Sequence, residues 1–217
     1  MNRRSFILGA TAIGAIAFVG GTFAYRESVA AAAREAATQL RGALYRRHAP
    51  IVGPVDAKVT ITEFFDPSCE ACRAFYPIVK QMMDMHAGKV RLVLRYAALH
   101  EGSDEAVRIL EAARMQDKFI PVLEALLAQQ PDWALHGAPD MEKAWAIAGA
   151  AGLDVTKAKT DSTSDAINAV LAQDAEDVTA VGLTQTPTFF VNGKPLTDFG
   201  PQQLFDLITA EVEASGS

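Results

Sequence analysis

The stretch Phe64-Phe65-Asp66-Pro67-Ser68-Cys69-Glu70-Ala71-Cys72 decides the fold of this chain. It ends a β-branched and aromatic segment, residues 59–65, which predicts a buried strand. Asp66-Pro67-Ser68 breaks that strand, and from residue 69 to about 87 apolar side chains recur at helical spacing. Residues 90–96 have the composition of a second strand. A strand, a helix and a strand at this spacing predict a βαβ unit with parallel strands.

The rest of the chain after residue 50 predicts one helical block followed by a hairpin. Residues 103–182 are rich in alanine and helical in pattern. Residues 187–191 then predict a strand, Asn192-Gly193 a hairpin turn, and residues 194–196 an edge strand, since Pro195 cannot donate to a central ladder. A closing helix is expected over residues 201–212.

The chain has only two cysteines, Cys69 and Cys72, three positions apart. A scaffold held by disulfides would need more of them, spread along the chain. At the start of a helix, unpaired N–H groups and the helix dipole stabilise a thiolate, so Cys69 is expected to be the nucleophile. Cys72, about one turn further on, is expected to resolve the mixed disulfide. The pair therefore predicts a redox-active disulfide that needs no cofactor.

Two other chemistries use closely spaced cysteines, and both fit less well. Structural zinc needs four ligands, and the four histidines, His48, His86, His100 and His136, show no paired spacing. Covalent haem attachment needs a histidine directly after the second cysteine, where Arg73 stands. We therefore expect no metal site, and keep a metal-binding, non-enzymatic module as the weaker alternative.

The stretch around Cys69 resembles the active-site region of the bacterial DsbA-like thiol–disulfide oxidoreductases. Gln185-Thr186-Pro187-Thr188-Phe189-Phe190-Val191-Asn192-Gly193 resembles the family's cis-proline loop and following hairpin. Residues 103–182 resemble the helical domain that the family inserts into its thioredoxin fold. The resemblance covers residues 51–213 and implies an α/β, thioredoxin-like fold with an inserted all-helical domain.

The resemblance implies roles for further residues. Glu63 matches an acidic residue buried beneath the cysteine pair, which can accept and return the proton of the resolving thiol. The alternative is a strand residue that faces solvent. Arg95 resembles the basic residue that pairs with this acid. Thr186 and Pro187 are expected to form a cis peptide beside the pair and to bind an extended substrate through backbone hydrogen bonds; a trans proline at the start of a strand is the alternative.

The dipeptide between the cysteines departs from the family's best-known oxidants, which have Pro-His there. Ala71 cannot donate to the Cys69 thiolate, and Glu70 adds a negative charge. We therefore expect a potential of about -165 to -205 mV, below the value near -120 mV of a strong oxidant. The expected function is a disulfide donor to exported proteins, reoxidised by a membrane redox partner. A reductase or isomerase kept reduced by a membrane electron donor is the alternative.

The N-terminal segment predicts export. Phe6 to Tyr25 is an uncharged run of twenty residues behind Arg3 and Arg4, and twenty helical residues reach about 30 Å, the thickness of a bilayer core. We expect a membrane anchor with the domain outside the cytoplasm, in the bacterial envelope or periplasm. A cleaved signal is the alternative, and Asn2-Arg3-Arg4-Ser5-Phe6 resembles a twin-arginine export signal.

Composition fixes the remaining expectations. Residues 27–47 are alanine-rich and predict a helical, solvated stalk, with a weak coiled-coil seam for oligomerisation as the alternative. After residue 47 the chain has thirteen basic and twenty-four acidic side chains, a net charge of -11, which disfavours nucleic acid as a partner. The predicted parts are an anchor or signal at 1–26, a stalk at 27–50, a thioredoxin-like domain at 51–102 and 183–217, and a helical insertion at 103–182.

Overall fold

The computed structural model describes the backbone of residues 3–216, and the side chains of residue 22 and of residues 25–216. The chain divides into two compact units, Met1–Gly42 and Ala43–Ser217. Helix α1, Arg3–Leu44, makes up the first unit and runs two residues into the second. Most side chains of the predicted anchor, Phe6 to Tyr25, lie outside the described residues. Within the described part of the chain, no helix combines the length and the apolar character needed to span a bilayer.

The second unit is built on a five-stranded sheet of order β1-β3-β2-β4-β5. Its strands are Ile51–Val52, Val59–Phe65, Val90–Tyr96, Thr188–Val191 and Lys194–Pro195, numbered β1 to β5 along the chain. β2 and β3 are parallel, with Val59 opposite Val90, as the βαβ pattern predicts. The other pairs are antiparallel, and β5 lies at the edge, where its proline leaves the ladder intact.

Helices α2, Glu70–Met85, and α9, Pro201–Ser215, pack against each other, and α9 also contacts β2 and β4. The apolar face of α2 includes Phe75, whose ring lies 5.5 Å from that of Phe189 on β4. Burial of this face against the sheet fixes where α2 begins, and therefore where Cys69 lies.

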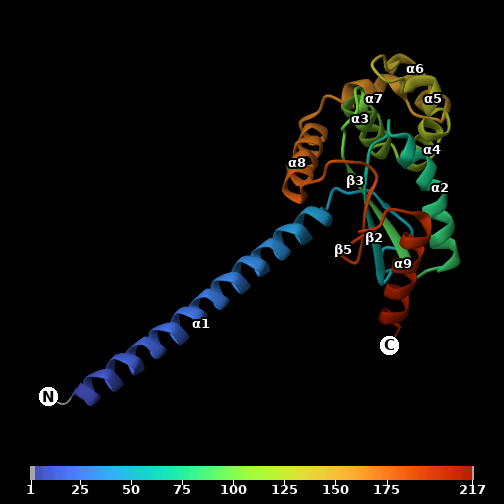
Figure 1. The fold of residues 1–217 in the computed structure, drawn as a ribbon. Helices are drawn as coiled ribbons and strands as arrows, with labels where there is room; N and C mark the ends of the chain where they lie inside the picture. The colour runs from blue at the N-terminus through green and yellow to red at the C-terminus, as the bar shows by residue number, and fades with distance from the viewer. Residues whose placement is uncertain (1–2, 217) are drawn as a thin grey trace. The chain divides into compact units, whose positions relative to one another are not determined.

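Six helices occupy the chain between β3 and β4. They are α3 Ser103–Arg114, α4 Phe119–Ala128, α5 Gln130–Trp133, α6 Met141–Ala150, α7 Val155–Asp161 and α8 Asp165–Val181. Figure 1 shows α3 to α7 gathered beyond one end of the sheet. Trp133 is completely buried among them and donates to the Leu126 carbonyl at 2.9 Å. Trp145, 4% exposed, is also buried in this helical block.

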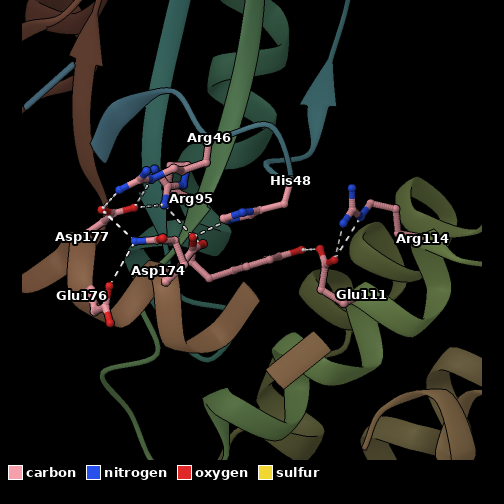
Figure 2. A network of polar contacts seen from close by, with 10 residues as sticks. Arg46, His48, Arg95, Glu111, Arg114, Asp174, Glu176 and Asp177 are labelled. Carbon is pink, nitrogen blue, oxygen red and sulfur yellow. Dashed lines mark hydrogen bonds and ion pairs between the residues drawn. The ribbon is translucent and has the colours of Figure 1, made fainter. Parts of the chain in front are cut away.

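A buried ionic network joins β3 to α8 (Figure 2). Arg95, which has no exposed surface, donates through Nη2 to Asp174 at 2.5 Å and to Asp177 at 2.7 Å. Arg46 Nη2 lies 2.6 Å from Asp177 Oδ1, and His48 Nε2 lies 2.6 Å from Asp174 Oδ1. Burial raises the pKa of Asp177, but the hydrogen bonds from Arg46 and Arg95 outweigh it and lower that pKa.

The expected pairing of Arg95 with Glu63 is therefore wrong, and the strand register explains why. Phe64 is opposite Arg95 and Glu63 is opposite Leu94. Because successive side chains on a strand point to opposite faces of a sheet, Arg95 shares a face with Phe64. Its guanidinium carbon lies 5.7 Å from the Phe64 ring centroid, on the face that α8 covers.

Candidate active site

Cys69 occupies the N-cap position of helix α2, and Cys72 lies in the first turn. Cys69 is 5% exposed and Cys72 is completely buried, and both are free thiols. The loop between β2 and α2 is closed by a hydrogen bond from the Cys69 amide to the Asp66 carbonyl at 3.1 Å. The Asp66 amide in turn donates to Cys72 Sγ at 3.4 Å. Strand and helix thus present one sulfur at the surface and hold the other behind it.

The two thiols differ strongly in acidity. The hydrogen bond from the Cys72 thiol is the largest cause that lowers the pKa of Cys69, to about 5, against the opposing effect of burial. Hydrogen bonds from the Cys72 and Ala71 amides act in the same direction. Burial raises the pKa of Cys72, as do the negative charges of Glu63 and Cys69. At neutral pH the first sulfur is a thiolate and the second a neutral thiol.

Glu63 is completely buried on β2, so the alternative of a solvent-facing strand residue is wrong. Among the described residues neither of its carboxyl oxygens has a hydrogen-bond partner. Burial, with a smaller contribution from the Cys69 thiolate, raises the pKa of Glu63 to about 8. A carboxyl group that is mostly protonated at neutral pH therefore lies within electrostatic reach of Cys72.

The loop before β4 brings Thr186 and Pro187 to the cysteines. Because β4 pairs with β2, the segment that precedes β4 lies beside the end of β2 from which the Cys69 loop leaves. Cys69 Sγ lies 3.3 Å from the Thr186 carbonyl oxygen. The Thr186-Pro187 peptide bond is cis, as the sequence predicts. The substrate-binding role of the two residues remains a prediction.

Asp66 organises the active-site loop, a role that the sequence did not reveal. Its carboxylate accepts hydrogen bonds from the Ser68 and Leu99 amides at 2.8 Å and from the Ser103 hydroxyl, and it lies 2.7 Å from His100 Nδ1. These partners come from the loop itself, from the segment after β3 and from α3. The carboxylate therefore ties the loop before Cys69 to the start of the helical block.

The helical block contributes two more side chains that sequence reasoning missed. Gln130 of α5 donates through Nε2 to the carbonyls of Pro67 at 2.7 Å and Cys69 at 3.0 Å. His136, after α5, lies with Nε2 2.7 Å from Glu70 Oε1. No local sequence pattern marks either residue, because each meets its partner over a separation of more than sixty residues.

Residues 46–210 match the model of a family described as thioredoxin. The chain belongs to the thioredoxin family. A solved thioredoxin-like oxidoreductase from Silicibacter pomeroyi is 30% identical to this thioredoxin-family chain, with a TM-score of 0.69, and the match covers 80% of this chain and 98% of that one. The thiol-disulfide exchange protein α-DsbA2 from Wolbachia pipientis has a TM-score of 0.67 at 20% identity, over 83% and 94% of the two chains, which shows the shared fold.

The match to curated proteins covers only part of them. The Na⁺/H⁺ antiporter NhaA of Herminiimonas arsenicoxydans is 31% identical over 165 residues, which are 76% of this thioredoxin-family chain and 25% of that protein. The chain thus spans about a quarter of the length of the curated relatives that it matches.

These comparisons confirm the thioredoxin-like α/β fold and the resemblance to DsbA-like proteins. The predicted enzyme class, an oxidoreductase of this family, is confirmed with them. Membership of the family does not by itself decide the roles of Cys69, Cys72, Glu63, Thr186 and Pro187.

Proposed function

We propose that this thioredoxin-family oxidoreductase donates the Cys69–Cys72 disulfide to exported proteins that contain cysteines. The proposal rests above all on the acidity of Cys69, whose pKa is lowered to about 5. A stabilised thiolate stabilises the reduced form of the pair, and a protein with a stable reduced form is a strong acceptor of electrons. The net flow of electrons is then from substrate thiols to this chain.

The first step is attack by a substrate thiolate on Cys69 Sγ, the less buried sulfur of the pair. A bond forms between the substrate sulfur and Cys69, the Cys69–Cys72 bond breaks, and Cys72 leaves with the bonding electrons. Burial makes a Cys72 thiolate costly, as its raised pKa indicates. The protonated carboxyl group of Glu63 can supply the proton that neutralises Cys72, and recover it when the disulfide is restored.

The second step releases the product. A second substrate thiolate attacks the first substrate sulfur, a disulfide forms in the substrate, and Cys69 leaves as a thiolate. The substrate has lost two electrons and the protein holds two thiols. Because the Cys69 thiolate is already stabilised at neutral pH, it is a good leaving group. A membrane redox partner that takes two electrons from the pair would complete the cycle.

The loop at Thr186 and Pro187 supports binding of an extended substrate next to Cys69. The Thr186 carbonyl lies 3.3 Å from Cys69 Sγ, so a peptide strand beside this loop would bring its own cysteine to Cys69. Backbone hydrogen bonds of this kind do not depend on side-chain identity, which suits an enzyme with many partners.

The proposed location is the bacterial envelope, with residues 1–26 as an inner-membrane anchor or a cleaved signal, and a stalk that begins at residue 27 and ends before the second compact unit at Ala43. The uncharged run behind Arg3 and Arg4 supports this. The side chains from Tyr25 to Gln39 are all exposed, which suits a solvated stalk. The ion transport of the curated relatives is not extended to this chain, since only a quarter of their length is matched.

The test is the redox state of the pair in intact cells. Acid quenching followed by alkylation with a mass-tagged maleimide separates disulfide from dithiol, and Cys69→Ser marks the position of a single free thiol. We expect mostly disulfide. A pair found mostly as dithiol would refute the donor role and favour a reductase or isomerase; self-association through the stalk, measured by sedimentation, would favour the isomerase.

A further inference from the structure

Two histidines from separate segments contact residues that flank Cys69 in the chain. His100 precedes α3, and its Nδ1 is 2.7 Å from Asp66 Oδ2. His136 follows α5, and its Nε2 is 2.7 Å from Glu70 Oε1. The two ring centroids are 6.0 Å apart. Both rings line a small cavity of about 60 Å³ with Ser68, the residue directly before Cys69.

The charged groups around this histidine pair are acidic. Asp66 faces His100 from the loop before α2, Glu70 faces His136 from α2 itself, and Glu101 lines the cavity from the segment that carries His100. No lysine or arginine is among the described residues that line the cavity. With neutral imidazoles, this group of side chains would have a net negative charge next to the segment that carries Cys69, which disfavours a thiolate.

The charge state of His100 depends on these neighbours. Partial burial opposes protonation, but the hydrogen bond to Asp66 and the negative charges of Asp66, Cys69 and Glu70 outweigh it and raise the pKa of His100. The interaction with Cys69 is mutual: a thiolate that favours the imidazolium is itself favoured by it. The hydrogen bond and charge of His136 also help to lower the pKa of Glu70, after the larger effect of its own backbone amide.

We propose that His100 and His136 are positioning residues that provide, from outside the Cys-x-x-Cys segment, the positive charge beside the Cys69 thiolate that Glu70-Ala71 lacks. The inference rests on the proposed function, because it concerns how far the pair favours its reduced form. It makes the oxidising strength of the enzyme depend on the charge of these side chains, and links it to the helical block that carries His136.

Exchange with glutathione isolates this effect. One glutathione thiolate attacks Cys69, the Cys69–Cys72 bond breaks, and Cys72 takes up a proton. A second glutathione thiolate attacks the glutathione sulfur of the mixed disulfide, which forms oxidised glutathione and releases Cys69 as a thiolate. Two electrons move from glutathione to the protein. Only the reduced protein has the thiolate that the imidazolium groups stabilise, so their loss shifts the equilibrium toward the protein disulfide.

The experiment measures this equilibrium constant at pH 6 and pH 9 for the full chain. We expect the double variant His100→Gln/His136→Gln to lower the constant for protein reduction about tenfold at pH 6, which is about 30 mV for two electrons. At pH 9, where imidazoles are mostly neutral, the difference from the wild type should be less than twofold. His136→Lys should match the wild type at pH 6 and exceed it at pH 9, since lysine keeps its charge.

His86→Gln is the matched control. His86 contacts Thr209 at the far end of α2, about 24 Å along the helix from Glu70 at 1.5 Å per residue, and should leave both constants unchanged. The His136 side chain is 70% exposed, so the single His136→Gln variant will fold even if loss of His100 loosens the Asp66 loop.

The possible outcomes separate the two proposals. If both glutamine variants have the same equilibrium constants for protein reduction as His86→Gln, the proposed role of the histidines is refuted. The proposed function is then unaffected. A decrease of equal size at pH 6 and pH 9 would also overturn it, because it would show a structural effect without charge. A wild-type protein that does not exchange with glutathione at either pH would refute the proposed function itself.

Discussion

Replacement of Glu63 by glutamine should stabilise the reduced protein increasingly as the pH rises, with a net gain at neutral pH and above. Burial raises the pKa of this carboxyl group from its ordinary 4.5 to about 8, so the folded protein resists an ionisation that the unfolded chain undergoes freely. At 1.36 kcal/mol for each pKa unit, this resistance lowers the free energy of unfolding of the wild type by about 3 kcal/mol at pH 7. The decrease approaches about 5 kcal/mol above pH 8. Below pH 4 the carboxyl group is protonated in both states and the cost disappears.

The assay is urea unfolding of the reduced protein between pH 4 and pH 9, with the free energy of unfolding of Glu63→Gln compared with that of the wild type. A buried glutamine amide without partners adds a destabilisation of roughly 1–3 kcal/mol that does not depend on pH. The raised pKa of Glu63 is therefore tested by how the difference in the free energy of unfolding changes with pH. Glu111→Gln is the control: Glu111 is also buried, but it accepts hydrogen bonds from Tyr96 and Arg114, and its loss should destabilise the protein.

The same variant tests the proton transfer. Without a carboxyl group to protonate Cys72, thiol–disulfide exchange at pH 7 should slow on the order of 100-fold. A difference in stability that stays flat from pH 4 to pH 9 would refute the raised pKa. Normal exchange in a variant with the expected slope would show that Glu63 is buried but takes no part in the proton transfer.

Three further predictions follow from the site and the ionic network. Cys69 should react with iodoacetamide with a pH midpoint near 5 while Cys72 stays unmodified, and Cys72→Ser should accumulate mixed disulfides with substrates; equal alkylation rates would refute the assignment. Ala71→His should raise the potential measured against glutathione by about 45–85 mV in the His100→Gln/His136→Gln background, and by less in the wild type, where the two imidazoles already stabilise the thiolate; equal increases in the two backgrounds would refute this. Asp174→Asn should cost about 3–5 kcal/mol in urea unfolding, against under about 0.5 kcal/mol for the exposed Asp206→Asn; equal costs would show that the buried network adds nothing to stability.

The sequence predicted the central strands and the cysteine helix because their signals are local. Residues 59–65 and 90–96 are strands with the predicted bounds, since a dense run of β-branched and aromatic residues leaves no other way to bury them. β1 was missed: it has two residues, and it exists because it pairs with the already formed β3.

The surroundings of the cysteines could not be predicted in the same way. Asp66 is close to Cys69 in the sequence, but its partners Leu99, His100 and Ser103 lie more than thirty positions away. The family resemblance paired Arg95 with Glu63, and this prediction was wrong because the Arg95 side chain points to the other face of the sheet. On adjacent strands, a shift of one position in the pairing moves a side chain to the opposite face of the sheet. No composition pattern reveals such a shift.

The ionic network also determines where this chain can be shortened. Ala43 and Leu44 are buried, and Arg46 and His48 bind Asp177 and Asp174, so all four belong with the second compact unit. A fragment that begins at residue 51, after the predicted stalk, would leave two buried carboxylates with the single positive charge of Arg95 among their described ion-pair partners. Such a fragment should aggregate or melt early, whereas one that begins at or before Ala43 keeps the charges balanced and is the better starting point for crystals and titrations.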